Sequence, residues 1–386
     1  MNSVRVNAKG TRRVVDGHLW VFRSDVIDTN GAEPGSAVRV LGPGGQALGT
    51  AHFSSASQIT LRMLSPQVEE IGRGFFLRRI EQAELHRRRV VRDSQAYRLV
   101  FGEGDLLPAL VVDRYGDYLV VQTLNQGMDQ ACAVILDCLV ELFRPRGVVA
   151  RNDVAIRAKE DLPLSSAVIC GEVPERVEVQ VNGLKFAADL LKGQKTGIYL
   201  DQRENYLAAA RYAGGKALDC FASTGGFALH LAGVCSSVEA VDSSAPALAA
   251  AACNARANEI GNIEFREADV FELLASYAAA RRHFSTVVLD PPAFAKSRKN
   301  LEGAARGYRE LSLRALRLLG PGGILVTCSC SHHVSEAMLL EMVAEAGLDA
   351  DRRLRVLERR TQAQDHPILL TVPETHYLTC LILEVL

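Results

Sequence analysis

The sequence predicts an α/β protein in which a small β-barrel domain and a central α+β domain precede a C-terminal doubly wound sheet of seven strands. Short strands with glycine-rich turns fill residues 1–72, and hairpin patterns flank a helix in residues 96–184. From about Tyr206 onward, strands alternate with helices, as in parallel sheets. We therefore predict domains at 1–72, 96–184 and 185–386, with a helical connector at 73–95.

The first domain and the connector are expected from short-range patterns. Residues 37–41 and 47–51 flank a turn rich in glycine and proline, and residues 59–63 alternate between apolar and polar side chains. These patterns predict a compact barrel. From residue 75 to about 93, apolar side chains recur near a spacing of 3.6, which predicts a helix.

The central domain is expected to be a β-β-α-β-β layer. Residues 110–122 alternate in polarity around Tyr115-Gly116-Asp117, which predicts a hairpin. A helix is expected over 131–143, followed by strands at 147–150 and 177–181.

The C-terminal domain is expected to place its ligand site at the carboxyl ends of its strands, as open α/β sheets do. The last two strands lack a clear helix between them, which predicts an antiparallel terminal strand. The strands are expected at 216–221, 237–242, 262–266, 285–290, 322–328, 353–358 and 376–384, with helices between them at 246–258, 306–319 and 335–346 among others.

Composition excludes several classes of protein. The formal net charge is −1, so the whole chain is not a polycation. Nine cysteines without a CxxC pair indicate neither a zinc knuckle nor a thioredoxin-like motif, and this usage fits a reducing cytoplasm. No metal site is predicted. The N-terminus lacks the apolar segment of a signal peptide, and no apolar run of about 18 residues predicts a membrane span.

Positive charge is concentrated in one segment. Residues 73–92 contain seven arginines against two glutamates. This pattern predicts either a solvated helix face or contacts with nucleic-acid phosphates. For the second reading the candidate RNA-binding residues are Arg78, Arg87, Arg88 and Arg89.

Acidic residues follow successive strands of the last domain. A glycine-containing loop after Asp219 allows close approach of the backbone to a ligand, although it is not the GxGxxG of dinucleotide sites. Asp242 follows the next strand, where a carboxylate can bind ribose hydroxyls, and Asp269 follows the third. Either acid can instead cap a helix. Asp290 is held at the end of the fourth strand by two prolines.

Two cysteines stand at or beyond the end of the fifth strand. Cys328 and Cys330 lie in VTCSCS, which follows the turn GPGG. A thiol at a strand end beside a nucleotide site indicates covalent chemistry. Free cysteine is also among the most buried residue types, so packing is the alternative.

At these motifs the chain resembles the class I S-adenosylmethionine-dependent methyltransferases. More narrowly, it resembles the bacterial and archaeal 23S ribosomal RNA cytosine-5 methyltransferases that carry an N-terminal PUA domain. The matching segments are GQKTGIYLDQREN at 193–205, DCFASTGG at 219–226, DPPAFAK at 290–296 and TCSCS at 327–331. The resemblance implies a Rossmann-like sheet, a PUA-like RNA-binding barrel, S-adenosylmethionine as cofactor, and 23S ribosomal RNA or a large-subunit assembly intermediate as partner.

The resemblance also implies roles for individual residues. Asp219 and the loop to Gly226 would hold the methionine part of the cofactor, Asp242 the ribose and Asp269 the adenine. Asp290 would line the junction of cofactor and base, and residues before the first strand would cover the pocket. The full set of implied cofactor-binding residues is Lys195, Tyr199, Arg203, Asp219, Phe221, Ala222, Thr224, Gly225, Gly226, Asp242, Asp269 and Asp290.

The implied reaction needs a cysteine thiolate, because carbon 5 of cytosine becomes nucleophilic only after a thiolate adds to carbon 6. Alignment on the helix around Glu336 places Cys330 at the catalytic position, whereas the string Thr-Cys-Ser selects Cys328; we favour Cys330. Asp290 is the candidate that hydrogen-bonds the base. A guanine methyltransferase and an inactive RNA-binding or ribosome-assembly protein stay as alternatives, and a homodimer stays open.

Overall fold

The computed structural model describes residues 1–193, 196–294, 300–331 and 333–386. The chain forms two compact units. The first unit contains residues 1–179, 188–197 and 364–375, and the second contains residues 180–187, 198–363 and 376–386. The C-terminal third of the chain therefore contributes a short segment to the first unit.

The N-terminal part of the first unit is a six-stranded sheet with the order β2-β6-β5-β4-β1-β3. Its strands close over a core that includes Val4, Val38 and Leu61. Helix α1 (Ala8–Val15) was not predicted; Asn7 caps it by accepting a hydrogen bond from the Gly10 amide. The strands are β1 (Ser3–Val6), β2 (Trp20–Phe22), β3 (Val26–Asp28), β4 (Ala37–Leu41), β5 (Ala47–Phe53) and β6 (Ile59–Ser65).

A second sheet in the first unit has the order β11-β10-β9-β8-β7, and α2 and α4 pack on it through a shared apolar core. The predicted hairpin is confirmed: β8 and β9 pair around Gly116 and Asp117. Strand β7 was not predicted. The elements are α2 (Arg73–Val90), β7 (Ala96–Phe101), β8 (Leu110–Tyr115), β9 (Tyr118–Thr123), α3 (Gln126–Gln130), α4 (Cys132–Phe143), β10 (Gly147–Arg151) and β11 (Ser166–Gly171).

The strand expected at 177–181 does not join this layer. β12 (Val177–Val181) pairs instead with β13 (Leu184–Ala188) in a separate two-stranded sheet. Asn182 and Gly183 connect them with φ angles of 52° and 81°, as in the two-residue turns that favour Asn-Gly. The edge place beside β10 is taken by β11, so the Asn-Gly pair was the overlooked signal.

The second unit contains the predicted seven-stranded sheet, with the order β16-β15-β14-β17-β18-β20-β19 in the residues described. β20 runs antiparallel to both neighbours, which confirms the expected terminal arrangement. The strands are β14 (Lys216–Cys220), β15 (Ser237–Asp242), β16 (Ile263–Glu267), β17 (Phe284–Leu289), β18 (Leu319–Ser329), β19 (Leu354–Arg360) and β20 (Thr379–Val385).

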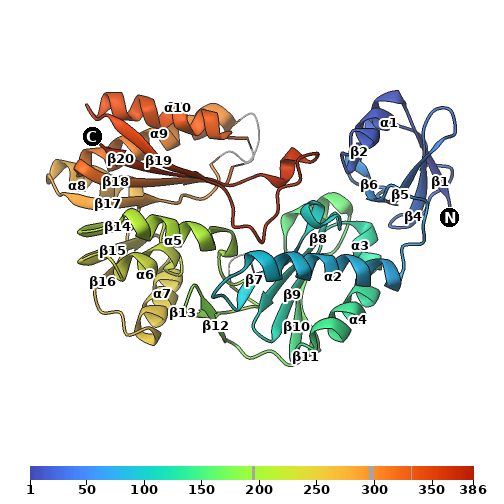
Figure 1. Ribbon diagram of the computed structural model, residues 1–386, viewed down its shortest axis with the longest axis horizontal. Helices are drawn as coiled ribbons and strands as arrows, with labels where there is room; N and C mark the ends of the chain where they lie inside the picture. The colour runs from blue at the N-terminus through green and yellow to red at the C-terminus, as the bar shows by residue number, and fades with distance from the viewer. Residues whose placement is uncertain (194–195, 295–299, 332) are drawn as a thin grey trace. The chain divides into compact units, whose positions relative to one another are not determined.

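Helices cover both faces of this sheet (Figure 1). One apolar core lies under α5 and α6, and another lies under α8, α9 and α10. The chain leaves β14 for β15 on one side, while β17 pairs on the other, so the strand order reverses at β14. Ligand sites of open α/β sheets lie at such a reversal. The helices are α5 (Arg203–Tyr212), α6 (Gly226–Ala232), α7 (Ala245–Ala257), α8 (Val270–Ala279), α9 (Leu301–Leu318) and α10 (Glu336–Asp349).

Candidate active site

The loop after β14 has an unusual backbone. Phe221, Ser223 and Gly225 have φ angles of 67°, 47° and 88°. Left-handed conformations are unfavourable for residues other than glycine and persist where surrounding bonds hold them. Here Ala222 donates to the carbonyl of Val241 over 2.9 Å, so the loop is tied to β15. The loop thus places Ala222, Thr224, Gly225 and Gly226 at the end of β14.

Asp219 lies beneath this loop and is 1% exposed. Its Oδ2 accepts a hydrogen bond from the Ala228 amide over 2.8 Å, whereas Oδ1 has no partner among the residues described. Burial, and then the nearby charge of Asp290, raise the pKa of Asp219 well above its ordinary value, although the Ala228 amide opposes this. A buried acceptor without a partner is costly unless a ligand satisfies it. The geometry therefore suits a bound cationic group.

The acids after the next two strands have different surroundings. Asp242 accepts from the Ser223 amide through Oδ2 and from the Ser244 amide through Oδ1, each over 2.9 Å. Each carboxylate oxygen has a second lone pair for a hydroxyl group. Asp269 is exposed and caps α8, because Oδ1 accepts from the Glu272 amide over 3.0 Å. Asp269 thus has the capping role that the sequence left open.

Tyr199 and Arg203 come from the segment before β14. Burial, and then the charges of Asp290 and other nearby acids, raise the pKa of Tyr199 to about 12, so its hydroxyl stays protonated near the site. Arg203 begins α5 and is 2% exposed. Lys195, predicted to cover the cofactor pocket, lies outside the residues that the structure describes.

Asp290 follows β17 directly. Its amide donates to the carbonyl of Cys220 at the end of β14 over 3.4 Å, and Oδ1 accepts from Gln202 Nε2 over 3.0 Å. The side chain of Cys330 lies beside the same turn, with Sγ 4.0 Å from the carbonyl oxygen of Pro291. The structure therefore brings Asp290 and Cys330 to neighbouring strand ends, as predicted.

The two candidate cysteines occupy different environments. Cys328 is 0% exposed, lies within β18 and faces Cys380 on β20. Burial, followed by its hydrogen bond with Cys380, raises the pKa of Cys328 well above its ordinary value. Cys330 lies just beyond the strand and is half-buried. A thiolate is therefore disfavoured at Cys328, whereas the side chain of Cys330 is partly exposed.

Hydroxyl groups on either side of Cys330 form a cluster that the sequence did not reveal. Ser329 Oγ donates to the Tyr308 hydroxyl over 3.0 Å, and Ser331 Oγ lies 3.2 Å from the same hydroxyl. Tyr308 belongs to α9, so no local spacing indicates this cluster. All three side chains are at most 2% exposed, so the cluster fixes the backbone on both sides of the thiol.

One of the four candidate RNA-binding arginines is misassigned. Arg87 is 1% exposed and forms an ion pair with both oxygens of Asp105, one of them 2.6 Å from Nη2. It also donates to the carbonyl oxygens of Arg98 and Asp365 over 2.7 and 2.8 Å. A guanidinium that is buried and bonded in this way cannot reach RNA, so its predicted role is wrong. The sequence shows a run of arginines but not which one turns inward.

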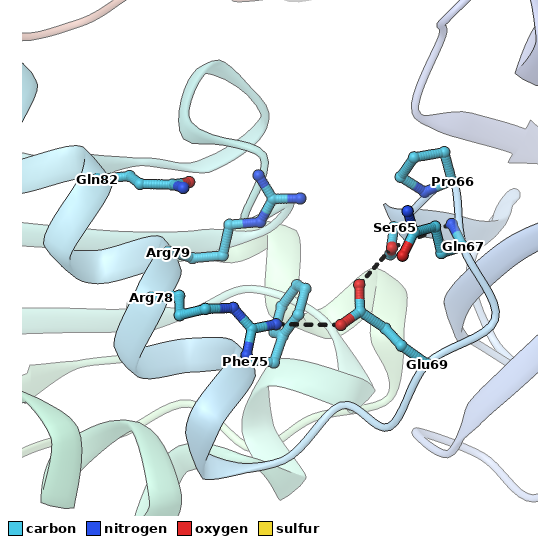
Figure 2. Close-up of a pocket in the computed structure, with 8 residues that line it drawn as sticks. All are labelled: Ser65, Pro66, Gln67, Glu69, Phe75, Arg78, Arg79 and Gln82. Carbon is cyan, nitrogen blue, oxygen red and sulfur yellow. Dashed lines mark hydrogen bonds and ion pairs between the residues drawn. The ribbon is translucent and has the colours of Figure 1, made fainter.

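The other three candidate arginines, Arg78, Arg88 and Arg89, lie on the surface of α2. Figure 2 shows Arg78 directed at Glu69 across a pocket of about 280 Å³, and the two side chains form an ion pair of 3.1 Å. Arg88 pairs with Glu84 one turn earlier over 3.1 Å, and its side chain is 70% exposed. Arg89 is also exposed. Exposed pairs of this kind are weak and can exchange for phosphates.

We also searched the described residues for metal-binding clusters and for membrane-spanning helices. No group of three or more His, Cys, Asp or Glu side chains in the described parts of the chain could hold a metal ion. Among the helices described, none combines the length and apolar character needed to cross a bilayer.

Known proteins resemble the chain throughout its length. Residues 150–370 match the model of the S-adenosylmethionine-dependent methyltransferase family, and residues 4–66 match that of PUA-like domains. The ribosomal RNA large subunit methyltransferase I of Shewanella denitrificans is 40% identical over 395 residues, covering 99% of this chain and 100% of the relative. The protein of the same name from Tolumonas auensis is 41% identical, covering 95% of each. A crystal structure of a methyltransferase complexed with SAH covers both chains fully with a TM-score of 0.87 at 20% identity, which shows a shared fold.

Proposed function

We propose that this chain, which belongs to the S-adenosylmethionine-dependent methyltransferase family, methylates carbon 5 of a cytosine in 23S ribosomal RNA. The observation that carries the proposal is the meeting of Asp290 and the half-buried Cys330 at adjacent strand ends of the family's sheet. The names of the relatives support large-subunit ribosomal RNA as the substrate. The PUA-like domain supports RNA binding.

The residues around β14 and β15 fit the cofactor. Oδ1 of Asp219, which has no partner among the described residues, would accept from the amino group of the methionine part, and Asp242 would accept from the ribose hydroxyls. The loop from Phe221 to Gly226 would lie against the methionine part. S-adenosylmethionine supplies a methyl group on a positively charged sulfur, which makes that carbon an electrophile.

The chemistry of the base then falls to Cys330 and Asp290. The Cys330 thiolate would add to carbon 6, and the electron pair that reaches carbon 5 would form the new bond to the methyl carbon. The methyl–sulfur bond would break at the same time, and its electron pair would stay on sulfur, which leaves S-adenosylhomocysteine. A base next removes the carbon 5 proton, and the electron pair of that C–H bond expels the thiolate and restores the ring. Asp290 would accept a hydrogen bond from the amino group on carbon 4. The target nucleotide must be unpaired or flipped out to reach these groups.

The base assignment is tested by methylating 23S RNA with the protein and isotopically labelled cofactor. The RNA is then digested to nucleosides and analysed by mass spectrometry. We expect the label in 5-methylcytidine. Label in a methylguanosine would contradict the proposal and favour the guanine methyltransferases that share these motifs, and absence of label despite cofactor binding would favour an inactive RNA-binding protein.

Cofactor affinity is expected to depend on pH through Asp219. Its raised pKa means that in the cofactor-free fold the neutral carboxyl persists to a higher pH than in an ordinary aspartate, and this neutral form must lose its proton before it pairs with a cationic amino group. The affinity for the cofactor should therefore rise as the pH rises through the raised pKa of Asp219. At a pH below that pKa, binding of the cofactor should release a proton. Asp219→Asn should weaken binding by about 1.5–3 kcal/mol and remove this dependence. Titration calorimetry in buffers of different ionisation enthalpy measures both effects; an unchanged pH dependence in the variant would refute the assignment.

Exposed arginines of α2 are expected to contact RNA phosphates. Replacing Arg88 and Arg89 by Ala should weaken RNA binding and lower the slope of log K against log salt by about 0.7–0.9 for each phosphate that the variant no longer binds. Filter binding between 50 and 300 mM salt, concentrations chosen to bracket roughly physiological ionic strength, measures the slope. Arg309→Ala, which removes ion pairs with Glu345 and Asp349, is the control. Equal slopes for wild type and the double variant would contradict the prediction.

A further inference from the structure

A chain of side-chain hydrogen bonds leads from the edge strand β19 to Asp290. Arg360 Nε donates to Asn205 Oδ1 over 2.8 Å. Asn205 Nδ2 donates to Gln202 Oε1 over 2.7 Å, and Gln202 Nε2 donates to Asp290 Oδ1 over 3.0 Å. Asn205 is 0% exposed and Gln202 is 2% exposed, so water does not compete for these bonds.

The groups at the Arg360 end allow this row of hydrogen bonds only one donor-to-acceptor direction. A guanidinium can only donate, so Asn205 must present its oxygen to Arg360. The backbone carbonyl of Thr361 can only accept, and Asn205 Nδ2 also donates to it over 3.0 Å. Both contacts demand the same orientation of the Asn205 amide. The Gln202 oxygen must then face Asn205, which leaves the Gln202 nitrogen to donate to Asp290.

The start of the chain is anchored by a group of charges. Arg360 Nη1 donates to Glu358 Oε2 over 2.7 Å. The other oxygen of Glu358 accepts from Arg211 Nη1 and from the Tyr212 hydroxyl, each over 2.9 Å. Arg211 and Tyr212 belong to α5, the helix that also contains Asn205. The guanidinium that sets the direction is therefore held between β19 and α5.

We propose that Gln202 and Asn205 are positioning residues that hold the Asp290 carboxyl group in one orientation for the target base. The strand and the two prolines fix the backbone of Asp290, but they do not by themselves set the orientation of its side chain. The donor from Gln202 selects one orientation in which Oδ1 is an acceptor. This inference rests on the proposed function, in which Asp290 accepts from the amino group of the base.

Positioning of this kind affects the rate strongly, since a displacement of about 1 Å can reduce a rate by about 100-fold.

The test compares wild type with Gln202→Met, Asn205→Leu and the double variant. Methionine keeps the length of glutamine but cannot donate, and leucine has the shape of asparagine. We expect kcat for transfer to any base of 23S RNA to fall about 100-fold for Gln202→Met and about 10-fold for Asn205→Leu. The double variant should match Gln202→Met, because both residues act through Asp290. The Kd for S-adenosylmethionine should change less than about 2-fold, which is far less than the tenfold change that corresponds to about 1.4 kcal/mol.

Asn262→Leu is the matched control. Asn262 donates to the backbone carbonyls of Ala232 and Cys235, each over 3.0 Å. It directly precedes β16 and so lies at the amino end of that strand, away from the carboxyl ends of the strands that carry the candidate site. It should lower stability and leave kcat unchanged. If the wild type is active and the Gln202→Met variant is fully active, or if the two effects simply add in the double variant, the positioning role of Gln202 and Asn205 alone is overturned. If the wild type binds the cofactor but methylates no RNA, the proposed function is overturned together with the positioning role.

Discussion

Replacing Cys330 by Ala is expected to lower methyl transfer by at least about 10³-fold, because the variant has no thiolate to activate carbon 5. Cofactor binding should be unchanged, since Asp219 and Asp242 stay in place. The thiol is half-buried and lies beyond the end of β18, so its removal leaves little empty volume and should cost little stability. The effect is therefore expected in kcat rather than in folding.

Cys328→Ala is the matched control for this experiment. Cys328 is 0% exposed and packs in the apolar core under α5 and α6. Its removal should cost about 1 kcal/mol of stability and leave most of the activity. A loss of activity with Cys328→Ala and full activity with Cys330→Ala would reverse the assignment.

Trapping of the covalent adduct provides the direct measurement. Fluorine at carbon 5 of the target cytidine blocks the final loss of a proton, so an RNA–protein adduct should accumulate in the presence of S-adenosylmethionine. Mass spectrometry of the linked peptide should identify Cys330 and the modified nucleotide together. The Cys330→Ala variant should give no adduct, whereas the Cys328→Ala variant should give as much as wild type.

Replacing Arg87 by Ala is expected to destabilise the protein by about 3–5 kcal/mol, the cost of leaving one partner of a buried ion pair alone. The change would leave Asp105 without its cation and would remove the donor to the carbonyls of Arg98 and Asp365. Asp365 belongs to the segment 364–375 that returns to the first unit, and its carboxylate accepts from the Arg98 amide over 2.8 Å. Arg87 therefore links α2, β7 and that segment.

Arg88→Ala is the control, because Arg88 is the next residue of the same helix but is exposed. Its pair with Glu84 should contribute about 0.3–0.5 kcal/mol. Urea unfolding followed by circular dichroism gives both values. A loss below about 1 kcal/mol for Arg87→Ala would mean that the buried pair contributes no more than an exposed one.

Periodic and local signals in the sequence were sufficient for much of the fold. Alternation and helical spacing predicted the seven strands of the last sheet along the sequence, because these patterns follow from which face each residue buries. The lack of a clear helix between the last two strands predicted the antiparallel final strand. Motifs that depend on neighbouring residues were also visible. The acids at the ends of the first four strands and the two prolines after Asp290 indicated one end of the sheet as the place of the candidate site, because parallel strands end at one edge.

The tertiary structure decided what depends on residues distant in the sequence. Alignment favoured Cys330 over Cys328, but the sequence could not show their different burial, because that difference lies in β20, whose Cys380 pairs with Cys328. Nor could it reveal that Arg87 turns inward, since its partner Asp105 lies in a different element.

The donor-to-acceptor directions of hydrogen bonds between distant residues were also decided by the tertiary structure. Gln202 donates to Asp290 only because Asn205 and Arg360, 155 residues apart, meet at a sheet edge. The sequence by itself therefore determined the methyltransferase family and its cofactor, and at which end of the sheet the family's motifs lie, since those depend on residue type and local pattern. Only the tertiary structure decided which of two similar side chains is buried and how the side chains are oriented, because burial and hydrogen-bond direction depend on partners brought together by folding.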